Sequence, residues 1–306
     1  MSVADRPGTA GGRRGVPPLP PRAALRWHVV RRIVAHLRPE SVLELGCGLG
    51  AVGMRLARTT RYAAVEPDGR SFEVAYRRIT PLGGTVHNGD HRQVPEGGPY
   101  DLVCAFEVLE HLADDATALA EWLPLVRPGG HLLLSVPADP DRFGPWDTLV
   151  GHYRRYSAAQ LRQRLTTAGA VPVQMIHYGW PLGYLLDSVR DRLAARRDTA
   201  VAPAAGAVVP AAEAVIPTAG GSGTAERAGT VDRAATAATP EERTSSSGRI
   251  LQPAGVLAGG AIRLAVAPFA LLQRMRPDRG PGLVALARRP TDDPSDRPAT
   301  SPAPPG

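Results

Sequence analysis

Residues 42–53 read Val-Leu-Glu-Leu-Gly-Cys-Gly-Leu-Gly-Ala-Val-Gly. The apolar residues of the first four positions predict a short strand of a parallel sheet that is covered on both faces. Alternating glycines at 46, 48 and 50 predict a tight turn in which no Cβ blocks the approach of a ligand. We expect a helix to begin near Ala51 and to direct its free N–H groups back into this turn. The stretch therefore predicts an α/β fold with a ligand site at the glycine turn.

Two classes of ligand fit this turn. Gly46-x-Gly48-x-x-Ala51 satisfies the dinucleotide fingerprint, and Glu66 follows about 20 residues later to bind a ribose. Read from Glu44, the same segment is acidic-x-Gly-x-Gly-x-Gly, which resembles motif I of class I S-adenosylmethionine-dependent methyltransferases. The turn alone does not distinguish the two ligands, so the choice depends on the rest of the chain.

The composition limits the classes of partner and compartment. The chain has 306 residues and a net charge of +7, and all of its basic residues other than histidine are arginines. The arginines are spread along the chain instead of gathering with aromatic residues on one element, so we predict no nucleic-acid partner. Cys47 and Cys104 lie in apolar segments without local histidines, which favours a reduced cytoplasmic chain over a disulfide scaffold or a zinc site. The first residues lack the apolar core of a signal peptide.

Further strands are expected downstream of the turn, at 61–66, 83–87 and 100–106. The strand at 61–66 ends in Glu66. Because the carboxyl ends of parallel strands face the ligand crevice, Glu66 is expected beside the glycine turn, where its two oxygens can accept both ribose hydroxyls. Asp68 is the better candidate to cap the helix that follows.

Three later motifs strengthen the methyltransferase resemblance. Gly89-Asp90 is similar to motif III, and residues 100–112, Tyr-Asp-Leu-Val-Cys-Ala-Phe-Glu-Val-Leu-Glu-His-Leu, resemble motif IV of methyltransferases of the ubiquinone-biosynthesis and methyltransferase-11/23 type. Residues 125–137, with Gly129-Gly130 before an apolar run, are similar to the fifth-strand signature of the same family. A dinucleotide enzyme has no reason to carry the last two motifs.

The resemblance implies a Rossmann-like α/β fold: a seven-stranded sheet of order 3-2-1-4-5-7-6 with the last strand antiparallel and helices on both faces. The sixth strand is expected at 171–178, and 282–289 is the remaining candidate for the seventh. The expected organisation is a disordered tail at 1–22, a methyltransferase core at 23–178 plus 282–289, an insertion at 179–281 and a disordered tail at 290–306.

The insertion has two kinds of sequence. Residues 196–248 are low in complexity and are expected to be disordered. Residues 250–275 are apolar and helical, but Arg263 and two prolines make them a poor membrane span. We interpret this part first as a lid over the substrate, and second as a peripheral membrane contact through 250–279.

The resemblance also assigns the site residues. Glu66 takes the ribose, Asp90 the adenine amino group, and the backbone near Phe106 and Glu107 closes the site, while the methionine part is held by Glu44, Gly46, Gly48 and Gly50.

A sulfonium already makes its methyl group electrophilic, so the protein needs to align a nucleophile and exclude water, and we expect no metal. His111, with titration expected near neutral pH, and then His152 are the candidate catalytic bases. A packing or capping role for His111 and a surface-loop role for His152 are the alternatives.

These observations predict an enzyme that uses S-adenosyl-L-methionine to methylate a small-molecule acceptor, with O-methylation slightly preferred to N- or C-methylation. Two alternatives stay open at this point. One is a nicotinamide-dependent oxidoreductase that uses the same turn, and the other is a non-catalytic cofactor-binding protein at a membrane surface.

Overall fold

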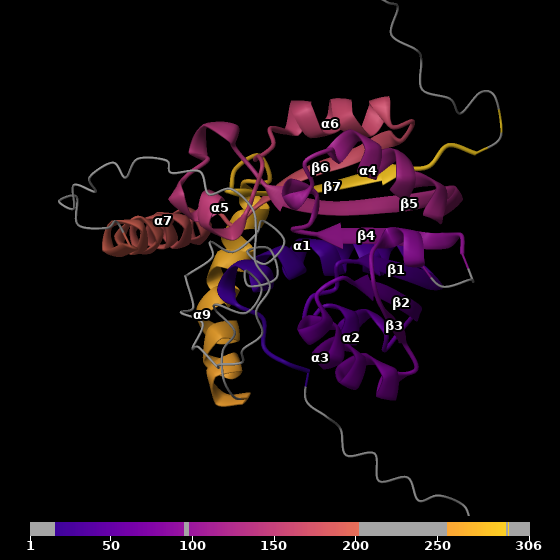
Figure 1. The fold of residues 1–306 in the computed structure, drawn as a ribbon, viewed down its shortest axis with the longest axis horizontal. Coiled ribbons are helices and arrows are strands. Elements are labelled where there is room, and N and C mark those ends of the chain that lie inside the picture. The colour runs from indigo at the N-terminus through magenta and orange to yellow at the C-terminus, as the bar shows by residue number, and fades with distance from the viewer. Residues whose placement is uncertain (1–15, 95–97, 202–255, 292, 294–306) are drawn as a thin grey trace, which may run out of the picture.

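The computed structural model describes residues 16–94, 98–201, 256–291 and 293. Within them, seven strands form one sheet of order β3-β2-β1-β4-β5-β7-β6, which confirms the predicted order (Figure 1). The last strand, β7, runs antiparallel to both β5 and β6, also as predicted. The strands are β1 (Ser41–Leu45), β2 (Arg61–Glu66), β3 (Thr85–Asn88), β4 (Tyr100–Phe106), β5 (Val126–Pro137), β6 (Val171–Tyr178) and β7 (Gly282–Arg288).

Two apolar cores cover the two faces of the sheet, because successive side chains of a strand point to opposite faces. In β1, Val42 belongs to one core, whereas Leu43 and Leu45 belong to the other. The first core is completed by α1 (Pro21–Leu37), α2 (Gly53–Leu56), α3 (Gly69–Ile79) and α9 (Val256–Met275). The second is completed by α4 (Asp115–Trp122) and α6 (Ala158–Thr167).

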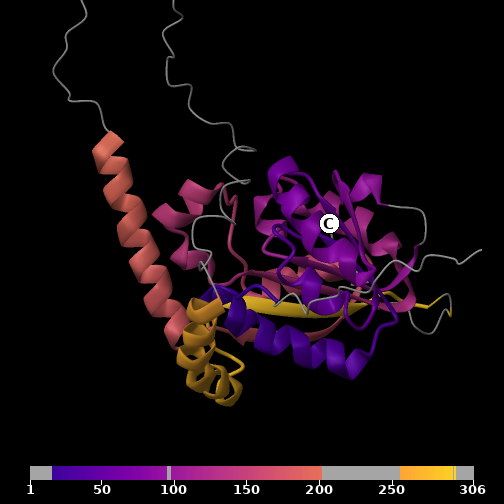
Figure 2. The ribbon, with the colours of Figure 1, turned by 90° about the horizontal axis from the view of Figure 1, so that it is seen from below.

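The remaining helices gather at the edge of the sheet where β4 ends. They are α5 (Pro145–Val150) and α7 (Leu182–Val201), and α7 extends away from the sheet (Figure 2). Short 3-10 turns connect the larger elements: η1 (Thr80–Leu82), η2 (His91–Gln93), η3 (Leu109–His111), η4 (Leu123–Leu125) and η5 (Pro140–Arg142).

Local sequence signals explain several boundaries. The side chain of Asp68 caps α3 by accepting the N–H of Ser71 at 2.9 Å, and Ser157 caps α6 in the same manner. The helix expected to begin near Ala51 instead begins at Gly53, because residues 48–52 complete the turn first. The third strand begins at Thr85, later than expected, because a left-handed glycine at 83 ends the preceding 3-10 turn.

The insertion contributes α7 and α9 to the described part of the chain. The predicted low-complexity stretch 196–248 lies outside the described residues apart from its first positions, which belong to α7. The tails at 1–22 and 290–306 also lie mainly outside them. α9 packs against α1: the side-chain amide of Gln273 donates to the Leu25 carbonyl at 3.1 Å and accepts the Gly179 N–H at 2.9 Å. Among the described helices, none has the length and apolar character needed to cross a membrane.

Candidate active site

The glycine turn and Glu66 lie against each other, as their strand positions predicted. β1 and β2 are parallel neighbours, and the N–H of Gly48 donates to the Glu66 carboxylate at 2.7 Å. Gly46 and Gly48 have φ values of +70° and +54°, a region that glycine enters without steric cost. A Cβ at Gly48 would meet no atom within 4 Å, so open space borders the turn beside this carboxylate. The turn therefore brings a carboxylate and open space together at the ends of β1 and β2.

Glu44 lies beneath the turn and not in its opening. It is buried, and its carboxylate accepts a hydrogen bond from the Tyr62 hydroxyl at 2.5 Å. Burial raises the pKa of Glu44 to about 7, against the opposing effect of the Tyr62 hydrogen bond. The Tyr62 hydrogen bond occupies one oxygen of this carboxylate.

The loop after β3 lies next to the end of β2. The N–H of Gly89 donates to the Glu66 carbonyl at 3.1 Å, and the Asn88 side chain donates to the same carbonyl at 2.9 Å. Asp90 is exposed and caps η2, where it accepts the N–H of Arg92 at 2.8 Å. The loop that carries Asp90 is thus held at the same sheet edge as Glu66.

Phe106 and Glu107 end β4 at this edge. Glu107 has a left-handed backbone, with φ +59°, and its N–H donates to the Ser135 carbonyl at 2.8 Å. Its carboxylate accepts the Tyr178 hydroxyl at 3.0 Å and lies 3.3 Å from the Arg26 guanidinium. Burial opposes the charged form, but the nearby arginines and this hydrogen bond hold the pKa of Glu107 at about 2. The side chain therefore remains ionised and anchors the strand end to α1 and β6.

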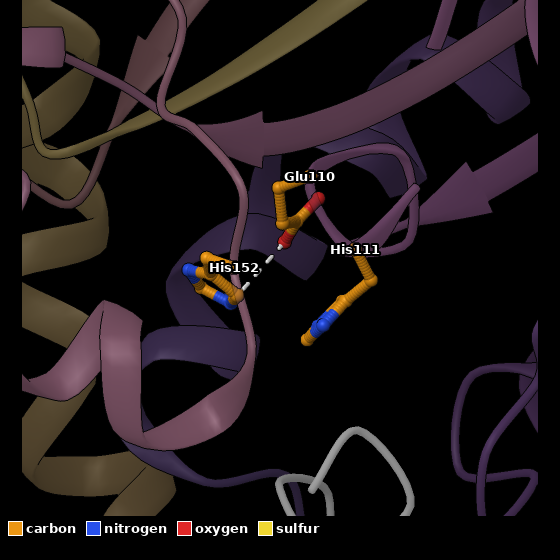
Figure 3. A group of neighbouring side chains, drawn as sticks. All are labelled: Glu110, His111 and His152. Carbon is orange, nitrogen blue, oxygen red and sulfur yellow. Dashed lines mark ion pairs between the residues drawn. The ribbon is translucent and has the colours of Figure 1, made fainter. Parts of the chain in front are cut away.

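The two candidate catalytic histidines, which are 41 positions apart in the chain, lie together. Their rings are 4.6 Å apart between centroids and cross at 80° (Figure 3). His111 ends η3, just after β4, whereas His152 belongs to the loop that follows α5. Burial and the neighbouring His152 lower the pKa of His111 to about 4, well below the near-neutral value that we expected. Its imidazole is consequently neutral at pH 7.

Two acidic residues that we had not assigned complete this cluster. Glu110 is fully buried beside the histidines, where burial and Glu107 raise the pKa of its carboxyl well above the ordinary value. Asp147 of α5 accepts a hydrogen bond from Nδ1 of His152 at 2.7 Å. Glu110 belongs to the Glu-Val-Leu-Glu-His run, which was a usable signal, whereas no sequence pattern connects Asp147 to His152.

The match to known families decides between the two ligand classes. The family model described as "Methyltransferase domain" matches residues 22–175, which is half of the chain. The chain belongs to this methyltransferase family. It contains an S-adenosylmethionine-dependent methyltransferase domain, and the cofactor is S-adenosyl-L-methionine, as the resemblance implied.

Individual relatives agree with this assignment. A Mycolicibacterium smegmatis protein named a probable S-adenosylmethionine-dependent methyltransferase is 33% identical over 150 residues, 47% of this chain and 57% of that protein. A ubiquinone biosynthesis O-methyltransferase of Acinetobacter baumannii is 32% identical over 119 residues, 36% of this chain and 49% of that enzyme. The methyltransferase thus spans about half the length of the curated relatives it matches.

Solved structures agree on the fold. The methyltransferase superposes with a TM-score of 0.50 and 15% identity on a chain from the Haloferax volcanii complex of the Trm112 methyltransferase activator with a methyltransferase. The match covers 89% of this chain and 92% of that one. At this identity the likeness shows the fold alone.

The buried Glu44 predicts how stability depends on pH. Because its folded pKa of about 7 lies above the ordinary 4.5, folding favours the protonated acid, and stability is lost as pH rises from about 4.5 through 7. The Glu44→Gln variant lacks this loss, so its unfolding free energy relative to the wild type should rise by up to about 3 kcal/mol between pH 4 and pH 8. Urea unfolding at several pH values measures the difference.

Glu40→Gln is the matched control, because Glu40 is exposed. Its unfolding free energy relative to the wild type should be the same at both pH values. Parallel pH curves for Glu44→Gln and the wild type would show that Glu44 is not a buried titrating acid.

Proposed function

We propose that the methyltransferase moves the methyl group of S-adenosyl-L-methionine to a hydroxyl oxygen of a small-molecule acceptor. The observation that carries the proposal is the pair of imidazoles, His111 and His152, at the same strand end as Phe106 and Glu107. Acceptor hydroxyls, unlike amines, need a group that promotes loss of a proton, and imidazole is the side chain most often used for this. The similarity to a relative named as an O-methyltransferase also supports this choice.

We propose that the glycine turn and the two neighbouring strand ends hold the cofactor. Glu66 would bind the ribose hydroxyls, Asp90 the adenine amino group, and the backbone at Phe106 and Glu107 would close the site. The methionine part would lie along Gly46, Gly48 and Gly50. Since the Glu44 carboxylate of β1 accepts a hydrogen bond from the Tyr62 hydroxyl of β2, we propose that it holds these two strands together next to the turn.

Bound S-adenosylmethionine would supply an activated methyl group, and the protein would supply position and proton transfer. His152 is the better placed base of the two. Its Nδ1 bonds to the buried Asp147 carboxylate, which would stabilise the imidazolium formed when Nε2 accepts a proton. The low pKa of His111 makes its imidazole a weaker base, so we propose that it helps to orient the acceptor.

A membrane-surface contact through the described part of 250–279 is a second proposal, and a specific observation favours it. Leu264 and Met275 of α9 are 79% and 73% exposed, and Arg263 and Arg274 are exposed on the same helix. Apolar side chains interspersed with arginines suit the interface of an anionic membrane.

We also propose a reducing, cytoplasmic location, supported by the buried free thiols of Cys47 and Cys104 and testable by cell fractionation.

Cofactor binding is tested by isothermal titration of the full chain. We expect S-adenosylmethionine to bind in the micromolar range, and Glu66→Gln to weaken it about 10- to 100-fold, because charged hydrogen bonds to the ribose are lost. Glu73→Gln, an exposed change on α3, is the control and should bind as the wild type does. Binding of NAD(H) in place of the sulfonium ligand and its demethylated product would overturn the proposal in favour of an oxidoreductase.

The histidine roles are tested by turnover with a panel of phenols, catechols and alcohols. We expect His152→Ala to lower kcat by about 100-fold or more, and His111→Ala to lower it as well, with the affinity for S-adenosylmethionine unchanged. His36→Ala, an exposed change at the end of α1, should leave kcat unaltered. Full activity in both site variants would remove the histidines from the reaction.

Membrane contact is tested by flotation with liposomes of neutral and anionic lipid. We expect binding to anionic vesicles only, and loss of it when Leu264 and Met275 are both changed to glutamate. Val173→Glu is the control, because Val173 is 54% exposed on the edge strand β6, away from α9. Binding that survives the double change would contradict a contact through α9.

A further inference from the structure

Three side chains converge beside the proposed acceptor position. Glu110 and His111 come from η3, and His152 comes from the loop after α5 (Figure 3). Each offers one ligand atom, and the three atoms lie within 4.8 Å of one another. Glu110 is buried and the two histidines are partly exposed, so the cluster lies at the boundary between the interior and the surface.

The cluster contains buried polar atoms that the described protein does not satisfy. Neither carboxylate oxygen of Glu110 has a hydrogen-bond partner, although the side chain is fully buried. Its Oε1 lies 3.9 Å from Nε2 of His152, which is too long for a hydrogen bond. Nδ1 of His111 is likewise buried without a partner. Buried carboxylates and ring nitrogens are normally hydrogen-bonded, so these atoms point to a missing ligand.

His152, which faces Glu110, is held in the tautomer that can bind a metal through Nε2. Nδ1 of His152 lies 2.7 Å from Asp147, and the other oxygen of Asp147 accepts Nε of Arg155 at 2.8 Å. Because Nδ1 donates its hydrogen to Asp147, the neutral ring carries its free lone pair on Nε2, and this nitrogen faces Glu110. A carboxylate behind a histidine is the common outer-shell arrangement at metal centres, where it fixes the tautomer and raises the basicity of the ligating nitrogen.

The arginines packed nearby pair with other carboxylates. Arg26 lies 3.3 Å from Glu107, and Arg155 lies 2.8 Å from Asp147. Neither makes an ion pair with Glu110 in the described part of the chain. A cation bound in the cluster would therefore supply the positive counter-charge that no described arginine supplies to the Glu110 carboxylate by an ion pair.

We propose that Glu110, His111 and His152 bind one divalent transition-metal cation, such as Zn²⁺ or Fe²⁺. Two imidazoles and one carboxylate match the preference of these ions, whereas Mg²⁺ prefers oxygen ligands only. With metal–ligand bonds of about 2.1 Å, tetrahedral ligand atoms lie about 3.4 Å apart. The three ligand atoms now lie within 4.8 Å of one another, so metal binding would require them to move closer together. We had expected no metal, because the methyl group of a sulfonium is already electrophilic.

The use of this cation rests on the proposed function, whereas its binding does not. The acceptor hydroxyl oxygen would bind at an open position of the cation, which lowers the pKa of the hydroxyl. The proton leaves to solvent, and the oxygen lone pair forms the new O–CH₃ bond. The C–S bond of the sulfonium breaks at the same time, and its electron pair stays on sulfur as a neutral thioether. With the cation bound, the two histidines would act on the acceptor through it, and this replaces the direct proton transfer to His152 that we propose for the metal-free protein.

The test is a titration of the chelator-treated full chain with Co²⁺, which reports its ligands by visible absorption, followed by displacement with Zn²⁺. We expect one ion per chain. Glu110→Gln, His111→Ala and His152→Ala should each weaken binding by at least tenfold. Asp147→Asn should weaken it about 10- to 100-fold by freeing the ring of His152. Zn²⁺ should raise the Tm of the wild type and leave that of Glu110→Gln unchanged.

The matched control is His36→Ala, which should keep wild-type Co²⁺ binding. Titration of each variant with S-adenosylmethionine checks that the fold is intact and reports separately on the proposed function. Absence of a Co²⁺ spectrum in a wild type that binds S-adenosylmethionine would overturn the metal site alone. An unaltered Co²⁺ spectrum in both Glu110→Gln and His152→Ala would place the ion elsewhere and equally overturn the proposal.

Discussion

The hydrogen bond from the Gly48 N–H to the Glu66 carboxylate is the contact on which the proposed cofactor site depends. It exists because β1 and β2 are parallel and in register, with Leu45 opposite Val65, so that both strands end at one edge. The N–H of Gly46 continues the pairing by donating to the Val65 carbonyl at 2.9 Å, and the chain then turns through left-handed glycines. The Glu66 carboxylate thereby lies next to the open space at Gly48, which suits a ligand with neighbouring hydroxyls.

Much of this arrangement could be predicted because its signals are local. The strands at 61–66, 100–106 and 171–178 have the predicted bounds, since each is an apolar run between turn residues. The glycine turn depends on backbone angles that glycine alone adopts readily, so its position follows directly from composition. The antiparallel β7 could be placed only through the family resemblance, because more than 100 residues separate it from β6 in the chain.

The parts that could not be predicted depend on contacts between distant segments. His111 and His152 were selected separately, and their contact arises because the loop after α5 returns to η3, where the Tyr153 N–H donates to the Glu110 carbonyl at 2.8 Å. The same return buries Glu110, and no local pattern distinguishes a buried carboxylate at this position from an exposed one. Likewise, the pairing of Arg26 with Glu107 joins the first helix to a strand end about 80 residues away.

A chain of buried charges extends from the first helix to this cluster and gives part of the insertion a structural role. Arg22 of α1 and Arg155 both pair with Asp187 of α7, and Arg155 also binds Asp147, which holds His152. Separating such a pair leaves an uncompensated charge in a buried setting, at a cost of about 3–5 kcal/mol. Movement of α7 away from the sheet would remove Asp187 from Arg22 and Arg155. We infer that these ion pairs hold α7 in place beside α1 and the loop that carries His152.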